Sequence, residues 1–319
     1  MIRTLAMAVA CLALTACGTD DPAPSPVLST AYGLPGAAVY PEGIALDPRT
    51  GTSYVGSYAD GTVFRAGADA ATAEVFLPAG ADGRKTTNGL RVDRDGRLWV
   101  IDSTAGVMVY DTGSRALLAR FDVPDDRPRF VNDLAFGADG SAYLTDSIRN
   151  VVYRATLANA AAGRGELTVA ADLAPVLGPR DPKTFELNGI VAEEAGAYLL
   201  VVAMSAGELY RIDLTGADPI RKVALTGGTV RNGDGLELRG DTLWVVHNTD
   251  NTISRWTVTD HGGAATRERE FHDPALSIPT TMVHSGDRAL IVSSQFDKGG
   301  PMGNDEKPGP FVVSAIDGF

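Results

Sequence analysis

The sequence predicts an all-β protein, a six-bladed β-propeller with four-stranded blades that occupies residues 28–319 as one domain. A short entry motif, followed by an apolar strand, a turn and a second strand, recurs six times along the chain. The motif begins at positions 42, 88, 132, 188, 234 and 280. Its separations of 44–56 residues match the length of one four-stranded blade. The chain also has 36 Gly and 18 Pro, which many short strands need for their turns.

Each copy continues in a way that supports a blade. After the second strand a polar turn leads to a third strand, expected at 62–65, 107–110, 151–154, 208–212 and 253–256. Fourth strands are weaker and are expected at 74–77 and 222–225. The chain ends soon after the third strand of copy six (311–316), so we expect a strand between Val27 and Tyr40 to close the ring. The alternative is an all-β sandwich whose strands have this spacing by coincidence.

The composition of the chain is that of a folded protein with an acidic surface. Among 319 residues, 44% are hydrophobic and 21% are charged, which excludes a disordered chain. Lys and Arg number 28 against 40 Asp and Glu, for a net charge of −12. Proteins that bind nucleic acid neutralise phosphates with cations, so this class is excluded. The charge suits a protein that binds a neutral or cationic ligand, or a metal cation. We expect the protein to be a monomer that acts on a small molecule.

The N-terminal segment is a targeting sequence. Arg3 precedes a short apolar run that ends in Leu14-Thr15-Ala16-Cys17, which resembles the lipobox of bacterial lipoproteins. Residues 1–17 are therefore expected to be a signal peptide with lipidation at Cys17, and 18–27 a flexible tether. This places the protein in the bacterial cell envelope, facing away from the cytoplasm and held to a membrane by a lipid anchor. The alternative is an ordinary secretory signal with an incidental Cys. The chain has two Cys, at 11 and 17, so no disulfide or thiolate site is expected in the mature domain.

The propeller topology brings the entry residues together. The first strand of each blade is the innermost, so its first residue lies at one end of the central channel. These residues are Glu42, Asn88, Asn132, Asn188, Asp234 and Thr280. The turns after the second strands return to the same face and carry Tyr58, Asp102, Asp146, Ser205, His247 and Gln295. In copy six this turn is enlarged to residues 296–310, which are either a lid over the pocket or a surface loop.

Two carboxylates and several amide carbonyls on one axis form an all-oxygen cage. Such a cage suits Ca²⁺, which takes 6–8 oxygen ligands. Asn-Gly and Asp-Gly also mark hairpin turns, which is the competing interpretation. The hairpin of each copy comes about five residues later, however, and has its own turn residues, such as Arg94-Asp95-Gly96.

These motifs resemble those of the regucalcin/gluconolactonase family of six-bladed propellers. The resemblance is carried by Pro41-Glu42-Gly43, Asn132-Asp133, Asn188-Gly189 and Asp234-Gly235, in this order along the chain. It implies one Ca²⁺ held by Glu42, Asn188 and Asp234, with Asn132 as a further ligand or a substrate contact. It also implies hydrolysis of a lactone or related ester, with Asp234 as base or nucleophile. Asn88 resembles the extra amide of the gluconolactonase-like branch.

Other residues are expected on the substrate side of the pocket. Arg129 lies near the position where the family often has a sugar-binding Arg, although Phe130 and Val131 separate it from Asn132. His247 could relay a proton, or it could be a surface His after a strand. Gln295 stands where phosphotriesterase-type members carry a His, so organophosphate chemistry is disfavoured.

Three functional hypotheses follow. The leading one is a Ca²⁺-dependent lactonase or esterase. The second is a non-catalytic propeller that binds a ligand or a protein and holds a structural calcium. The third is a strictosidine-synthase-like lyase or condensing enzyme, which uses a catalytic Glu and needs no metal site.

Overall fold

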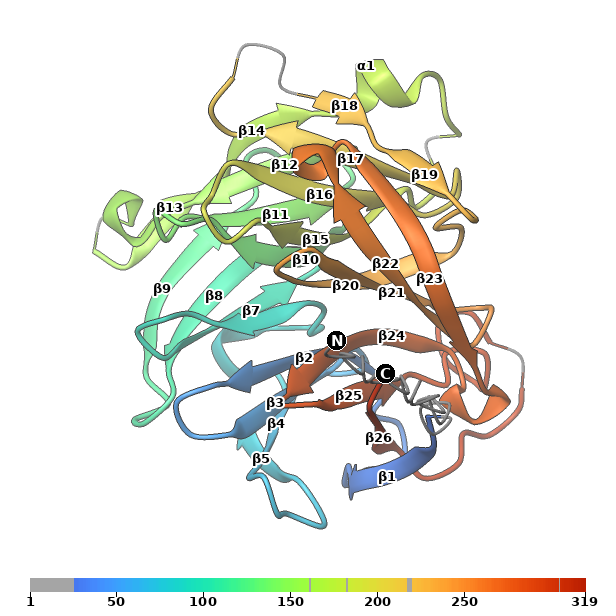
Figure 1. The fold of residues 1–319 in the computed structure, drawn as a ribbon. Coiled ribbons are helices and arrows are strands. Elements are labelled where there is room, and N and C mark those ends of the chain that lie inside the picture. The colour runs from blue at the N-terminus through green and yellow to red at the C-terminus, as the bar shows by residue number, and fades with distance from the viewer. Residues whose placement is uncertain (1–25, 161, 182, 217–219, 304) are drawn as a thin grey trace, which may run out of the picture.

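Six small sheets arranged around a central axis form a β-propeller in the computed structural model, which describes residues 26–160, 162–181, 183–216, 220–303 and 305–319. Inner strands such as β10 (Val131–Phe136), β15 (Leu187–Ala192) and β20 (Gly233–Arg239) lie toward the middle of Figure 1, and the outer strands lie at its periphery. The predicted six-bladed all-β fold is confirmed. The expected leader 1–17 with Cys17, and all but the last two residues of the tether 18–27, lie outside the described residues.

The blades follow the sequence in order, each beginning with its inner strand. Blade one consists of β2 (Pro41–Asp47), β3 (Thr52–Ser57), β4 (Val63–Ala66) and β5 (Glu74–Leu77). Blade two consists of β6 (Leu90–Val92), β7 (Arg97–Asp102), β8 (Gly106–Asp111) and β9 (Leu117–Asp122). Blade three consists of β10, β11 (Ala142–Asp146), β12 (Val151–Ala155) and β14 (Thr168–Asp172).

The second half of the ring repeats this plan. Blade four consists of β15, β16 (Tyr198–Ala203), β17 (Glu208–Asp213) and β18 (Ile220–Lys222). Blade five consists of β20, β21 (Thr242–His247), β22 (Thr252–Thr259) and β23 (Ala264–His272). Blade six consists of β24 (Pro279–Ser285), β25 (Arg288–Ser293), β26 (Val312–Asp317) and β1 (Leu28–Gly33).

Two blades have a fifth strand, which corrects the expectation of four strands in every blade. β13 (Arg164–Glu166) pairs in parallel with β9 of blade two, and β19 (Ala224–Thr226) pairs in parallel with β23 of blade five. The single fourth strand expected at 222–225 is wrong, because the chain crosses there from β18 to β19 and so joins two blades. Residues 155–185, within the longest interval between two entry residues, contain β13, β14 and the one helix of the described residues longer than three residues, α1 (Ala174–Leu177).

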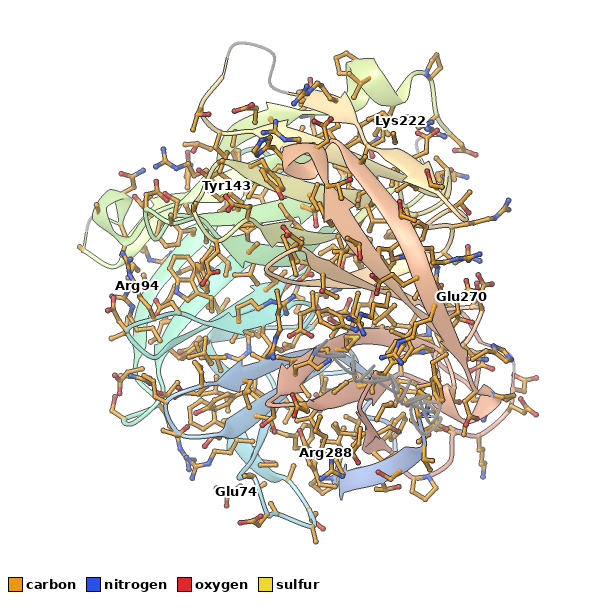
Figure 2. All side chains as sticks on the ribbon, viewed as in Figure 1. Glu74, Arg94, Tyr143, Lys222, Glu270 and Arg288 are labelled. Atoms are coloured by element: carbon orange, nitrogen blue, oxygen red, sulfur yellow. The ribbon has the colours of Figure 1, made fainter. Side chains whose placement is uncertain are left out.

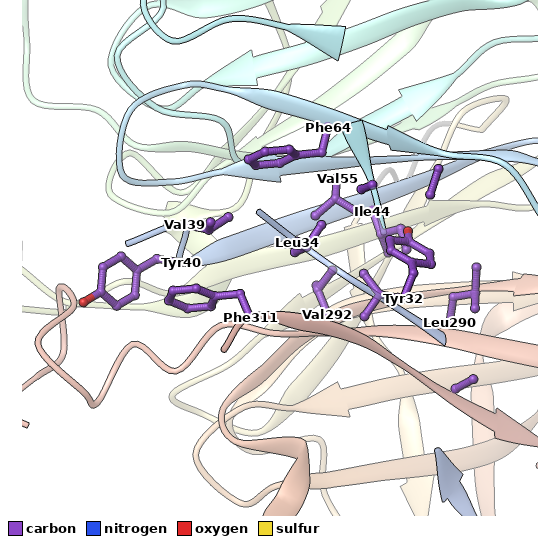
Figure 3. Packing of buried hydrophobic residues seen from close by; sticks show 14 of the residues in the cluster. Tyr32, Leu34, Val39, Tyr40, Ile44, Val55, Phe64, Leu290, Val292 and Phe311 are labelled. Atoms are coloured by element: carbon purple, nitrogen blue, oxygen red, sulfur yellow. The ribbon is translucent and has the colours of Figure 1, made fainter. Parts of the chain in front are cut away.

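The ring closes as predicted. β1 pairs antiparallel with β26, so a strand from the N-terminal part of the chain completes the last blade. Tyr32 of β1 is buried, and its side chain belongs to a core that also contains Ile44 of blade one and Val313 of β26. Figure 3 shows Tyr32, Ile44 and Val292 together between the blue strands of the early chain and the red strands of blade six.

Polar side chains occupy the outside of the molecule. Glu74 and Lys222 lie on outer strands, Arg94 lies in a turn and Arg288 begins β25, and all four are away from the middle of the ribbon (Figure 2). Within the part of the chain that the structure describes, no helix has the length and apolar character needed to cross a lipid bilayer.

Candidate functional site

A cavity of about 340 Å³ opens at one end of the inner strands. Its lining contains five of the six entry residues, namely Glu42, Asn88, Asn132, Asn188 and Asp234. The sixth, Thr280, does not line the cavity, and its hydroxyl instead donates a 2.6 Å hydrogen bond to the backbone carbonyl of Glu42. The structure therefore brings all the expected metal ligands to one place.

A backbone irregularity at the start of the inner strands presents these side chains. The ladder between first and second strand shifts register between Pro41 and Ile44, and equivalent shifts occur in blades three to six. Each shift spans the entry residue and its successor. Such bulges twist a strand locally and redirect a side chain, so the entry residue leaves the alternation of the strand and faces the cavity.

A glycine follows four of the six entry residues and permits close packing between blades. A Cβ on Gly43 would lie 2.4 Å from the carbonyl oxygen of Asn88, and one on Gly189 would lie 2.2 Å from that of Asp234. Both contacts are shorter than any side chain tolerates. Glycine therefore lets the entry residue of one blade lie directly against that of the next.

Three asparagines that line the cavity have an amide oxygen without a partner. The Oδ1 atoms of Asn88, Asn132 and Asn188 are buried and accept no hydrogen bond. Because burying a polar atom without a partner costs free energy, three such atoms around one cavity indicate a ligand that accepts electron pairs. The entry residues thus present unused acceptors together with the carboxylates of Glu42 and Asp234.

In blades three, four and five, the residue after the second strand holds the entry side chain in place. Ser147 Oγ lies 2.9 Å from Asn132 Nδ2, and Met204 Sδ lies 3.4 Å from Asn188 Nδ2. In blade five, Asn248 Nδ2 donates to Asp234 Oδ2 at 3.0 Å. In blades three and four this partner binds the Nδ2 atom of the asparagine, and the Oδ1 atom of the same side chain stays without a partner.

The two carboxylates are buried and repel each other. Burial raises the pKa of Glu42 well above its usual range, and the negative charges of Asp234 and Asp133 raise it further. Burial likewise raises the pKa of Asp234 to about 8, although hydrogen bonds from Asn248 and Asn188 oppose this. The positive charge of Arg91 opposes the rise in the Glu42 pKa, and its Nη2 lies 3.3 Å from Asp133 Oδ2. A divalent cation would remove the conflict between the carboxylates.

The donor set fits calcium better than zinc. Within the described residues no group of three or more His, Cys, Asp or Glu is arranged to hold a metal ion, and no His or Cys is among the described residues that line the cavity. The cavity instead combines two carboxylates with three unpartnered amide oxygens. Oxygen ligands of this kind, carboxylates mixed with carbonyls, are those that Ca²⁺ takes in proteins.

Three predicted substrate contacts lie away from the cavity lining. Arg129 is half-buried, and its guanidinium donates to the backbone carbonyls of Thr104 and Asp125 beside a separate surface depression. His247 is buried with Nδ1 2.7 Å from the carbonyl of Arg231 and Nε2 2.6 Å from Ser254 Oγ. Burial lowers the pKa of His247. Gln295 accepts a hydrogen bond from the Gly309 amide and so supports the enlarged turn. Their positions do not favour direct contact with a substrate.

The enlarged turn 296–310 contributes to the cavity. Phe296, Pro301 and Met302 are among its lining residues. The turn is anchored by the Tyr40 hydroxyl, which donates to the Lys298 carbonyl at 3.0 Å. The turn forms one wall of the cavity, and it also reaches the surface, where Met302 is half exposed. Each of the two interpretations, lid and surface loop, therefore describes part of the turn.

Sequence reasoning missed the apolar wall and one polar support. Phe130, Phe185 and Met204 line the cavity, but they lie just before or just after strands, where no periodicity marks them. Asn248 could have been found, because it occupies the place in copy five that Ser147 occupies in copy three, directly after the second strand.

Comparisons with known proteins bear on the fold. No family model matches the chain, and no curated protein matches it by sequence. Among solved structures, a calcium-binding protein, regucalcin, from Agrobacterium tumefaciens aligns with a TM-score of 0.63 at 16% identity, covering 89% of this chain and 91% of that one. A gluconolactonase from Xanthomonas campestris aligns with a TM-score of 0.61 at 19% identity, covering 91% of this chain and 89% of that one.

This chain has a regucalcin/gluconolactonase-like propeller fold. Virginiamycin B lyase from Staphylococcus aureus is also similar, with a TM-score of 0.58 at 13% identity and coverage of 92% of this chain and 99% of that one. At such low sequence identity, these structural alignments establish the shared propeller fold only. The activity has to be argued from the residues of the cavity.

Proposed function

We propose that this propeller is a Ca²⁺-dependent hydrolase of a lactone or related ester. The observation that carries the proposal is the convergence of three unpartnered amide oxygens and two buried carboxylates on one cavity. The likeness to a regucalcin described as calcium-binding and to a gluconolactonase agrees with this assignment. Glu42, Asn188 and Asp234 would hold the ion, with Asn88 and Asn132 as further oxygen ligands or substrate contacts.

When bound, calcium would supply positive charge that polarises the substrate carbonyl. The chain's own residues then position the reaction. Asn248 and Asn188 fix the Asp234 carboxylate by hydrogen bonds, so that it can take a proton from water or attack the carbonyl itself. Overall, water gives a hydroxyl to the acyl carbon and a proton to the alkoxide oxygen as the acyl–oxygen bond breaks.

The proposal is tested by calcium titration and a lactone screen on the same protein preparations. Calorimetry should show one Ca²⁺ per chain, and both Glu42→Gln and Asp234→Asn should abolish this binding because each removes a carboxylate ligand. Hydrolysis should disappear in chelator and in both variants. Asp287→Asn is the matched control, because Asp287 is an exposed carboxylate outside the cavity lining. Hydrolysis that persists in chelator, or in Asp234→Asn, would overturn the proposal.

A non-catalytic calcium propeller is the second candidate. It is favoured by the burial and full hydrogen bonding of His247, since no histidine then lines the cavity among the described residues. Calcium binding that depends on Glu42 and Asp234, without hydrolysis of any lactone or ester in the screen, would select this candidate over the hydrolase.

The proposal includes an envelope location with a lipid anchor at Cys17 and a monomeric propeller that acts on a small molecule. It is supported by the lipobox-like Leu14–Cys17 segment. In bacterial cells the full chain should fractionate with membranes, and Cys17→Ser should release it into the soluble envelope fraction. Membrane association that survives Cys17→Ser would exclude the anchor.

A further inference from the structure

Four aromatic rings form a continuous row along the cavity lining, which we call the aromatic rim. The Phe130 and Phe185 rings meet edge to face, with centroids 4.7 Å apart and planes at 89°. Tyr58 continues the row, with its ring centroid 6.4 Å from that of Phe130 and 5.5 Å from that of Phe296. All four residues line the cavity. An aromatic row of this length is a contact surface for an apolar group.

The backbone fixes this rim from blades three and four. The Phe130 amide donates to Asp146 Oδ1 at 3.1 Å, and its carbonyl accepts from the Ser147 amide at 2.8 Å. The amide of Glu186, next to Phe185, donates to the Ser147 carbonyl at 3.0 Å. Phe185 nevertheless leaves 44% of its surface exposed, and Met302 leaves 50%. Large apolar side chains that stay exposed on a fixed backbone at a cavity mouth mark a binding surface.

The cavity offers no positive side chain. No Lys, Arg or His is among the described residues that line it, and the guanidinium of neighbouring Arg129 is bonded to backbone carbonyls instead. The two carboxylates would balance the charge of one divalent cation. An acidic substrate would therefore find no residual attraction in the cavity.

Few polar groups line the cavity besides the entry residues, which we call its floor. Apart from the five entry residues, the clearly hydrogen-bonding lining residues are Tyr58, Asn232, Asn248 and Thr249. Asn248 is used by Asp234 and by the Thr249 amide, and Asn232 donates to Asp250. A polyhydroxylated sugar lactone would leave several hydroxyl groups against aromatic and methionine side chains, which costs free energy when they lack partners.

We infer that the site takes an uncharged lactone or ester with an apolar body. The carbonyl lies toward the Asn88, Asn132 and Asn188 floor, and the body contacts Phe130 and Phe185. This inference rests on the proposed function for the ester chemistry, while the apolar contact is a property of the cavity itself. The volume of about 340 Å³ is at the small end of ligand pockets, about 300–1,000 Å³, so the body is a single ring or a medium-length chain.

Binding measurements on the intact protein test the inference without relying on turnover. Calorimetry with γ-phenyl-γ-butyrolactone, unsubstituted γ-butyrolactone and freshly dissolved δ-gluconolactone is done with and without calcium. The phenyl lactone should bind at least about 10-fold more tightly than either polar comparison. Phe130→Ala and Phe185→Ala should each weaken its binding by roughly 3- to 10-fold and leave that of γ-butyrolactone unchanged.

Leu118→Ala is the matched control. Leu118 is an exposed apolar residue of β9 outside the cavity lining, so its removal should not alter lactone binding. Equal affinity for the phenyl and polar lactones, or no effect of either Phe variant, would overturn the inference. Tight phenyl-lactone binding without any hydrolysis would uphold the inference and reject the hydrolase. Calcium-dependent hydrolysis of polar lactones only would support the hydrolase and overturn the inference of an apolar substrate.

Discussion

At the residue scale, the surroundings of Asp234 disfavour its ionised form. The side chain is 6% exposed, and burial raises its pKa to about 8. In the unfolded chain the same carboxyl ionises near pH 4. Between these two values the folded protein keeps a proton that the unfolded chain has released. Folding without a metal is therefore most favourable at low pH for this group and becomes less favourable as the pH rises.

This argument predicts the pH dependence of the metal-free protein. In chelator, the melting temperature should fall as the pH rises from about 4 to about 8, because the raised Asp234 pKa favours the folded state only while the carboxyl is protonated. In Asp234→Asn the melting temperature should fall less over this pH range. In the wild type with saturating calcium it should rise with pH instead. Thermal melts across this pH range measure the effect. The exposed Asp287→Asn should retain the wild-type profile, and a metal-free Asp234→Asn profile identical to that of the wild type would contradict the account.

Gly189 shows how tightly the entry residues pack. A Cβ there would lie 2.2 Å from the backbone oxygen of Asp234 and 2.8 Å from the Leu236 amide. Neither atom can move without displacing the strand that carries Asp234.

Gly189→Ala should therefore destabilise the fold by about 1–3 kcal/mol, the usual cost of overpacking. It should also weaken calcium binding, since it pushes Asp234 away from Asn188. Chemical denaturation and calorimetry measure the two effects. The matched control is Gly67→Ala, where a Cβ meets nothing within 4 Å and stability should be kept or slightly raised. Equal stability of the two variants would refute the packing argument.

At the scale of the strands, closure depends on β1. This strand forms the outer edge of blade six, yet Tyr32 is buried and its hydroxyl lies 2.7 Å from Ser53 Oγ of blade one. The side chain thus joins the last blade to the first in addition to the ladder with β26.

Removing this side chain should loosen the closure. Tyr32→Ala should cost about 3–5 kcal/mol, as for other buried aromatic residues, whereas Tyr32→Phe should cost only about 0.5–1.5 kcal/mol for the lost hydrogen bond. Val169→Ala on β14, with 56% of the residue exposed, should stay within about 0.5 kcal/mol of the wild type. Denaturant unfolding ranks the three variants. A Tyr32→Ala variant as stable as Val169→Ala would show that β1 is dispensable.

The strands were predictable to different degrees. Inner and second strands such as β2 and β3 were found because their apolar runs and turns recur with the blade. β13 and β19 were missed because each is three residues long and mostly exposed, so their pairing depends on the neighbouring blade rather than on their own sequence.

The floor of the cavity was predictable for the same reason as the strands. The entry residues Glu42, Asn132 and Asp234 occupy fixed places in the repeat, and topology brings such places to one axis. The aromatic rim lies in connections of unequal length, so Phe130 and Phe185 meet only in three dimensions. The direction of the Arg129 side chain was likewise not encoded in its distance from Asn132.

At the scale of the whole molecule, the candidate ligands span the closing blade. Glu42 belongs to blade one and Asp234 to blade five, and blade six lies between them, with β24 packed against both β2 and β20. Thr280 of β24 hydrogen-bonds to the Glu42 carbonyl. Calcium bound by Glu42 and Asp234 would therefore draw together the two neighbours of the one blade that contains both an early and a late strand of the chain.

Calcium should accordingly protect the whole ring and not just the inner strands. If the propeller opens as one unit, calcium at about 100 times its dissociation constant should slow exchange through global opening by about 100-fold. Hydrogen exchange measured by mass spectrometry should show this slowing in β1 and β26 as well as in β2 and β20, and Asp234→Asn should abolish it at all four strands. Protection that stops at β2 and β20, leaving β1 and β26 unchanged, would mean that the closing blade opens independently of the calcium site.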